Sequence, residues 1–213
     1  MFEDRSDAGI ALAGALEAHR GGPLLVLAIP RGGVEVGYQV AKHLGAEFSI
    51  LIARKLPLPY NPEAGFGAIA EDGSTFVFHE AAARIPGPML EAIQRRQREE
   101  IERRIQALRG GAPLPELAGR TVILVDDGIA MGSTMRAAIL LCKRRSAAKI
   151  VVAAPVAGER IIRELETLVD EVVVLERPPA FRAVAQVYRN WYDVQDSEVL
   201  DILERWRLDR AEP

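Results

Sequence analysis

The sequence has few of the features that mark several large classes of protein. Cys142 is its only cysteine, so no disulfide can form within the chain. No apolar stretch approaches the roughly 18 residues that a membrane span needs. The formal net charge of −3 creates no overall field that would attract nucleic acid or anionic lipid. The N-terminal segment has no basic stretch before an apolar run, so no signal peptide is expected. We therefore expect a cytoplasmic protein with no membrane or nucleic-acid partner.

Metal-binding patterns are scarce as well. The three histidines, His19, His43 and His79, show neither the spacing of metal ligands nor that of a catalytic triad. With a single cysteine, the chain also lacks any zinc or iron–sulfur pattern. A resident metal held by side chains alone is not expected.

The main feature that is present is a series of five short apolar runs rich in β-branched residues. Runs that are apolar on both faces are typical of buried strands in a parallel sheet. These runs lie at 24–29, 48–53, 121–126, 149–154 and 171–176. Helical patterns separate them, at 6–20, 33–44, 132–145 and 158–168. The alternation predicts an α/β fold, a parallel sheet with helices on both faces.

Two segments interrupt this alternation. Residues 54–80 are rich in proline and glycine, which predicts a long irregular excursion of the kind that often forms a functional lid. Residues 88–109 form an amphipathic helix with charged outer faces. A solvated surface helix is its default interpretation, and a homodimer contact is the alternative.

The last part of the chain is rich in aromatic residues and ends in a helix expected at 196–207. We expect a single domain over 1–213, with a core at about 20–177, a lid at about 54–80 and a small C-terminal cap, or hood, at about 178–213.

The segment TVILVDDGIAMGSTMR (121–136) carries the most specific chemical signal. A buried strand delivers Asp126 and Asp127 to its C-terminal end, where open α/β sheets bind ligands. The following turn, from Gly128 to Ser133, leads into a helix whose free N–H groups can hold an anion. Carboxylates beside an anion site suit a ligand that has both hydroxyls and a phosphate, such as ribose 5-phosphate.

A second anion-binding turn is predicted earlier in the chain. LAIPRGGVEVG (27–37) reads as a strand, a Gly-Gly turn and a helix. Arg31 is its charged group, and the amides of residues 32–34 are its donors.

VILVDDGIAMGST resembles the signature of the type I phosphoribosyltransferases, an apolar strand followed by two acidic residues and a turn ending in Thr-Gly-Gly/Ala/Ser-Thr. The segment 53–73 and FRAVAQVYRNWYDVQDSEV (181–199) also resemble a bacterial group of predicted phosphoribosyltransferases. The resemblance therefore covers most of the chain.

The resemblance implies a donor, 5-phosphoribosyl 1-pyrophosphate (PRPP), and a role for each motif. Asp126 and Asp127 would hold the ribose 2- and 3-hydroxyls and serve as catalytic residues, together with Lys55. The residues that would wrap the 5-phosphate are Gly128, Ala130, Met131, Gly132, Ser133 and Thr134. Those that would bind the pyrophosphate are Arg31, Gly32, Gly33, Arg54 and Lys55. Mg²⁺ would reach the acidic pair through PRPP and water, without a direct protein ligand.

One position departs from the family pattern, and a second distinguishes between branches of the family. Met131 stands where many members have threonine, which removes one hydroxyl donor to the phosphate. Ala130 stands where the hypoxanthine and guanine branch has an aspartate that serves as the base toward the purine ring. Alanine at that position speaks against that branch.

The resemblance implies a phosphoribosyltransferase of nucleotide salvage and nucleoside metabolism, which transfers phosphoribose to a nitrogenous base and releases pyrophosphate. Its acceptor would lie under the cap, with Tyr188, Trp191 and Tyr192 as candidates for stacking. The alternative is a regulator that senses PRPP without turnover. A Rossmann oxidoreductase is disfavoured because Gly32-Gly33 lacks the three-glycine spacing, and a receiver domain because Gly-Ser-Thr follows the acids so closely.

Overall fold

The computed structural model describes residues 1–211 and contains a central sheet of five parallel strands in the order β2-β1-β6-β7-β8. The strand bounds are β1 Leu24–Ala28, β2 Glu47–Ile50, β6 Thr121–Val125, β7 Lys149–Val156 and β8 Glu171–Glu176. Every pairing between them is parallel. The α/β fold expected from the apolar runs is confirmed.

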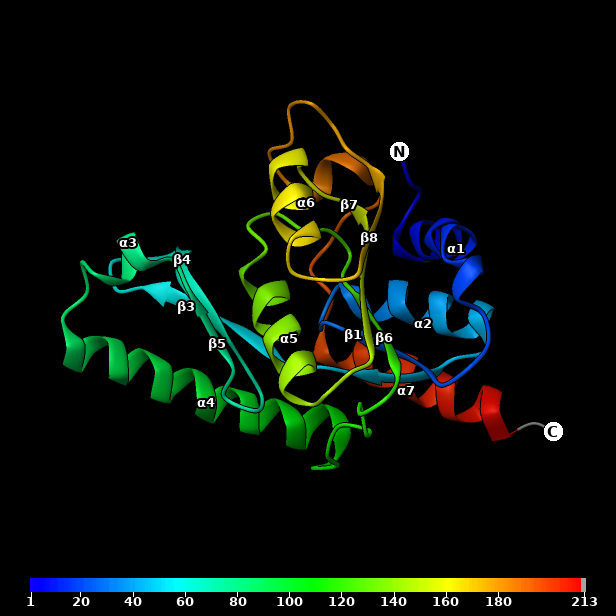
Figure 1. The fold of residues 1–213 in the computed structure, drawn as a ribbon, viewed down its shortest axis with the longest axis horizontal. Helices are drawn as coiled ribbons and strands as arrows, with labels where there is room; N and C mark the ends of the chain where they lie inside the picture. The colour runs from blue at the N-terminus through cyan, green and yellow to red at the C-terminus, as the bar shows by residue number, and fades with distance from the viewer. Residues whose placement is uncertain (212–213) are drawn as a thin grey trace.

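Helices cover both faces of this sheet (Figure 1). One face carries α1 Arg5–Ala15, α2 Gly33–Leu44 and α7 Asp196–Ala211, and the other carries α5 Ser133–Arg144 and α6 Glu159–Glu166. Alternate residues of β1 point to opposite faces of the sheet: Val26 packs in the core under α1, α2 and α7, and Leu27 packs in the core under α5 and α6. This explains why the strands read as unbroken apolar runs.

The segment expected to be an irregular excursion is instead an ordered antiparallel sheet of three strands. Its strands are β3 Ala53–Leu58, β4 Asn61–Ala70 and β5 Thr75–Val77. The proline and glycine residues are accommodated locally: the register shifts on both sides of Pro57, and a Cβ on Gly67 would lie 2.1 Å from the Phe76 carbonyl oxygen. Pairing between strands therefore overrides the loop-like composition.

This sheet and the helices that follow it form an arm beside the core (Figure 1). The helices are α3 His79–Ala82 and α4 Gly87–Arg109. At the end of α4, Arg109 donates 3.0 Å to the Ile50 carbonyl and forms a buried 2.5 Å ion pair with Glu71. The arm is thus joined to the edge of the main sheet.

The segment between β8 and α7 crosses the C-terminal ends of the strands and includes the short helix η2 Val184–Val187. The N-terminal segment pairs with it, since the Phe2 amide donates 2.7 Å to the Val187 carbonyl and the Arg189 amide donates 2.9 Å to the Phe2 carbonyl. The remaining short helix, η1 Glu17–His19, follows α1. Helix α7 does not lie over the strand ends. It packs on the face of the sheet, where Trp206 meets the ring of Phe48 edge-on at a centroid distance of 5.4 Å. The hood over the strand ends therefore consists of the segment between β8 and α7 together with the N-terminal residues that pair with it, and it does not include α7.

No helix within residues 1–211 is both long and apolar enough to cross a membrane.

Candidate functional site

The acidic pair lies directly after β6, at the C-terminal end of the strand, where both residues are partly buried. The Asp127 amide donates 2.9 Å to Oδ1 of Asp126, which fixes one carboxylate against the backbone of the next residue. Burial, followed by the charge of Asp127, raises the pKa of Asp126 well above its usual range. Burial also raises the pKa of Asp127, but Arg5 opposes that shift. The pair is therefore held in an environment that disfavours two full negative charges.

The loop after β1 lies against this pair because β1 and β6 are neighbours, with Ala28 opposite Val125. A Cβ on Gly32 would lie 1.8 Å from Asp127 Oδ2, and one on Gly33 would lie 2.8 Å from the Asp126 Cα. The peptide between Pro30 and Arg31 is cis. The structure thus brings together the two motifs that the sequence placed about a hundred residues apart.

The turn after the acidic pair is shaped by two glycines. A Cβ on Gly128 would lie 2.4 Å from Val184 of the hood, so the hood packs directly on the turn. Gly132 has a φ of +69°, a left-handed conformation that glycine adopts readily, and α5 begins at the next residue. The first amides of α5, from Ser133 onward, lack helical acceptors and suit an anion. Met131 is 55% exposed at this turn.

Arg136 supports the turn from within α5. Its Nη1 donates 3.2 Å to the Met131 carbonyl, and its Nη2 forms an ion pair with Glu164 of α6. The backbone at Met131 is therefore anchored although its side chain is exposed.

Arg54 and Lys55 lie on β3 of the arm, where adjacent side chains point to opposite faces of the strand. Arg54 Nε donates 3.2 Å to Gln97 Oε1 of α4. Burial lowers the pKa of Arg54, and the charges of Arg104 and Arg31 act in the same direction. The Lys55 side chain packs against Gly65 of the neighbouring strand β4, where an added Cβ would lie 2.6 Å from the Lys55 Cγ. Of the expected basic pair, Arg54 therefore faces α4, on the opposite side of β3 from Lys55.

The three hood aromatics expected to contact the acceptor have different surroundings. Tyr188 is buried and donates 2.7 Å from its hydroxyl to the Asp127 carbonyl, and burial raises its pKa. Trp191 lies against Arg5, whose guanidinium carbon is 4.1 Å from the ring centroid. Tyr192 alone among the three lines a described cavity. Tyr188 thus contacts the acidic site directly and Trp191 contacts it through Arg5, whereas Tyr192 both contacts Arg5 and lines the cavity.

Arg5 is the site residue that the sequence reasoning missed. Its Nε donates 2.8 Å to Asp127 Oδ2, and both side chains are largely buried. A signal was available: the buried residues of α1 include Arg5, Ala8, Gly9 and Leu12, which recur at helical spacing. A charged residue on an otherwise apolar stripe needs a buried partner.

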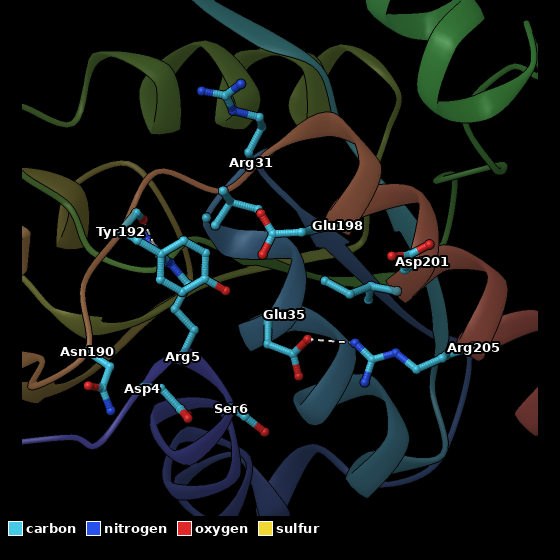
Figure 2. Close-up of a pocket in the computed structure, with 13 residues that line it drawn as sticks. Asp4, Arg5, Ser6, Arg31, Glu35, Asn190, Tyr192, Glu198, Asp201 and Arg205 are labelled. Carbon is cyan, nitrogen blue, oxygen red and sulfur yellow. Dashed lines mark hydrogen bonds and ion pairs between the residues drawn. The ribbon is translucent and has the colours of Figure 1, made fainter.

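A cavity of about 470 Å³ opens beside the Gly32 loop and Arg5 (Figure 2). Its walls come from the first turns of α1 and α2, from α7 between Glu198 and Arg205, and from the hood. In Figure 2 the Tyr192 ring lies across the Arg5 side chain, and Arg31 projects from the loop above Glu198. On the opposite wall, Arg205 is paired with Glu35 at 3.0 Å. The cavity therefore connects the loop, the hood and α7.

Comparisons with known proteins agree with this arrangement. The sequence model of the family described as the phosphoribosyl transferase domain matches residues 4–190. Two curated proteins from strains of Mycobacterium tuberculosis, named as candidate phosphoribosyl transferases, are each 40% identical over 214 aligned residues. That alignment covers 100% of this chain and 48% of each relative, so the chain spans about half of their length.

A solved structure is similar over its whole length. The crystal structure of the protein TT1426 from Thermus thermophilus superposes with a TM-score of 0.81 and 37% sequence identity. The superposition covers 97% of this chain and 99% of that one. The arm, the sheet and the hood thus belong to an arrangement that occurs in another organism.

Proposed function

This chain belongs to the phosphoribosyl transferase family, a family of pentosyltransferase enzymes, and we propose that it transfers phosphoribose from PRPP to a nitrogenous base. The observation that carries the proposal is the close packing of the Gly32-Gly33 loop on Asp126 and Asp127. This packing provides groups for ribose hydroxyls and groups for pyrophosphate on adjoining pieces of backbone. A ligand that joins a ribose to a pyrophosphate matches both.

In the proposed reaction the bond between ribose C1 and the pyrophosphate oxygen breaks, and a bond between C1 and an acceptor nitrogen forms. The acceptor loses one proton, and the pyrophosphate leaves with the bonding electrons. Positive charge builds on the ribose as negative charge builds on the leaving group, so groups at both ends contribute. Asp126 and Asp127 orient the ribose hydroxyls, while Arg31 and the amides of residues 32–33 stabilise the pyrophosphate.

The 5-phosphate is proposed to bind at the start of α5. Gly132 lets the backbone approach the phosphate closely, and the hydroxyls of Ser133 and Thr134 add hydrogen bonds to the helix amides. The exposed Met131 offers no hydroxyl, so the backbone carries more of the binding at this point.

Mg²⁺ is the metal that the family resemblance implies, and the donor set fits a metal carried by the substrate. Within residues 1–211 no group of three or more His, Cys, Asp or Glu side chains is arranged to hold a metal ion. Oδ2 of Asp127 already accepts from Arg5. Mg²⁺ would therefore be held mainly by oxygens of PRPP and water beside Asp126 and Asp127, where it would neutralise charge on the leaving pyrophosphate.

The arm is proposed to cover the site during the reaction. Arg54 and Lys55 lie on its first strand, and the charge of Arg31 contributes to lowering the pKa of Arg54. Covering the ribose would exclude water, which would otherwise compete as the acceptor. Lys55 is the arm residue proposed to reach the pyrophosphate.

The acceptor is proposed to enter the cavity of Figure 2, because that cavity reaches both the pyrophosphate loop and the hood. Of the three hood aromatics, Tyr192 is the one that lines this cavity, so it is the residue proposed to stack on the acceptor base. Ala130 cannot serve as a base toward a purine, which leaves the identity of the base to be determined by assay.

Pyrophosphate release from PRPP and Mg²⁺, measured against pooled purine and pyrimidine bases, tests the proposal. The wild type should release pyrophosphate in one pool. Asp127→Asn should lower that rate by more than about tenfold while the protein remains folded. A fully active Asp127→Asn enzyme would refute the role of that carboxylate.

A thermal shift with PRPP alone separates the enzyme from a PRPP sensor. A clear shift without release in any pool would favour a sensor, or an acceptor outside the pools. No shift and no release would show that the chain does not bind PRPP.

A further inference from the structure

Arg5 is a buried cation at the start of α1, and its position is fixed on several sides. It is 6% exposed, and its Nε donates 2.8 Å to Oδ2 of Asp127. Its Nη1 donates 3.1 Å to the Tyr192 carbonyl. The guanidinium lies 4.1 Å from the centroid of Trp191 and 5.5 Å from that of Tyr192. The group is therefore held between a carboxylate and two aromatic rings, a geometry that the planar guanidinium suits and an ammonium does not.

The same contacts define the orientation of Asp127. Gly32 leaves no room for a Cβ beside Oδ2, and Arg5 bonds that same oxygen. The Asp127 carbonyl accepts from the Tyr188 hydroxyl at 2.7 Å. Both the backbone and Oδ2 of Asp127 are thus engaged by Tyr188 and Arg5, so Oδ1 is the oxygen that we assign to a ligand.

Charge provides a second reason for the ion pair. Asp126 and Asp127 are adjacent and partly buried, and the site proposed beside them receives a pyrophosphate. An unpaired Asp127 would be costly to bury and would repel that ligand. Arg5 offsets its charge without placing a new hydrogen-bond donor on Oδ1.

We propose that Arg5 is a positioning residue for the donor: it holds the Asp127 carboxylate so that Oδ1 accepts a hydrogen bond from a ribose hydroxyl. Trp191 and Tyr192 act through Arg5, which explains why hood aromatics lie against a residue of the N-terminal helix. This inference rests on the proposed function, because it requires that Asp127 binds the ribose.

The test is a double-mutant cycle on ribose 5-phosphate binding, with Arg5→Met, Asp127→Asn and the double variant, read by titration calorimetry. Arg5→Met alone should weaken ribose 5-phosphate binding by about tenfold or more, the loss typical of a misplaced charged hydrogen-bond partner. In the Asp127→Asn background, Arg5→Met should cause little further loss. Losses that multiply would show that Arg5 acts independently of Asp127 and would overturn the proposal, as would an unchanged affinity in Arg5→Met.

Two further variants separate positioning from folding. Arg5→Lys keeps the charge but not the planar contacts, so it should fold and should recover part of the affinity lost in Arg5→Met; recovery of none of it, in a folded protein, would count against the proposal. Arg189→Met is the matched control, because Arg189 forms an exposed 3.1 Å ion pair with Glu3 between the same two segments. It should bind ribose 5-phosphate as the wild type does, since exposed pairs contribute little.

Inorganic pyrophosphate distinguishes failure of this proposal from failure of the proposed function. If the wild-type protein binds neither ribose 5-phosphate nor pyrophosphate, the proposed function is refuted, and this inference is refuted with it. Wild-type binding of both, with an additive cycle, would overturn the role of Arg5 alone.

Discussion

The backbone of Gly32 approaches the carboxylate of Asp127 so closely that a Cβ on residue 32 would lie 1.8 Å from Oδ2. The backbone conformation itself is not the constraint, because Gly32 has a φ of −60° and a ψ of −35°, which alanine tolerates. Only the contact with Asp127 requires glycine at this position.

Gly32→Ala should therefore weaken PRPP binding by more than about tenfold, because either the loop or Asp127 must move. Calorimetry with PRPP measures the loss. Gly14→Ala is the control, because apart from the neighbouring backbone of α1 itself no atom lies within 4 Å of a Cβ at that position. That change should leave binding unaltered and stabilise the helix by about 0.5–1 kcal/mol. Equal affinity in Gly32→Ala and wild type would contradict the proposed packing of the loop on the acid.

The raised pKa of Asp126 gives a prediction for stability against pH. The folded state holds this proton to a higher pH than the unfolded chain does, so the folded state binds more protons between the ordinary and the raised pKa. The free energy of unfolding should therefore fall as the pH rises through that window, from about pH 4 upward. Asp126→Asn removes this group and should reduce the slope.

Urea unfolding of both proteins at several pH values measures the two slopes. Asp126→Asn should be the more stable protein at neutral pH, because its amide can still accept from the Asp127 amide without a buried charge. The same variant should lose PRPP binding. Identical slopes would indicate that Asp126 is not the group responsible.

Met131 at the start of the proposed phosphate site offers a change that should improve binding. Its carbonyl is anchored by Arg136, and its side chain is 55% exposed, so a smaller hydroxylated residue can replace it without disturbing the core. Met131→Thr should tighten ribose 5-phosphate binding by roughly twofold to tenfold, which corresponds to one hydrogen bond of about 0.5–1.5 kcal/mol. Pyrophosphate binding, which uses the other loop, should stay constant. Weaker ribose 5-phosphate binding would argue against a phosphate at this turn.

Asp196, the first residue of α7, lies between two arginines that suit an anion. Its Oδ1 is 3.7 Å from Nη1 of Arg31, and its Oδ2 is 4.0 Å from Nη2 of Arg103. Oδ1 is buried and has no hydrogen-bond partner among residues 1–211. A pyrophosphate that binds Arg31 must compete with this carboxylate.

Asp196→Asn should therefore tighten the binding of inorganic pyrophosphate, by up to about fivefold, as expected for the loss of a partly exposed ion pair. Glu204→Gln on the same helix is the control, because Glu204 pairs only with exposed Arg207 at 3.3 Å in the described contacts. Weaker pyrophosphate binding in Asp196→Asn would mean that this carboxylate supports the site instead of competing for it.

Sequence patterns were sufficient to predict the parallel sheet, the order of the motifs along it and the position of the acidic pair at the end of a strand. The run predicted at 121–126 contains the strand β6 at 121–125, and the acidic residues 126–127 follow that strand at the edge where parallel strands end together. These features depend on the spacing of apolar residues and on the order of segments along the chain, and both can be read from a single sequence. The helix at 33–44 was predicted with the bounds that the structure has.

The use of individual side chains was decided only by tertiary packing. The arm strands 53–70 pair with each other although their composition reads as a loop, because the register absorbs Pro57 and the close approach at Gly67. Trp191 packs on Arg5, and Arg5 bonds Asp127 across 122 residues of chain. A pattern along the chain shows that Arg5 lies on a buried stripe, but the partner of a buried charge depends on which distant segments the fold brings beside it.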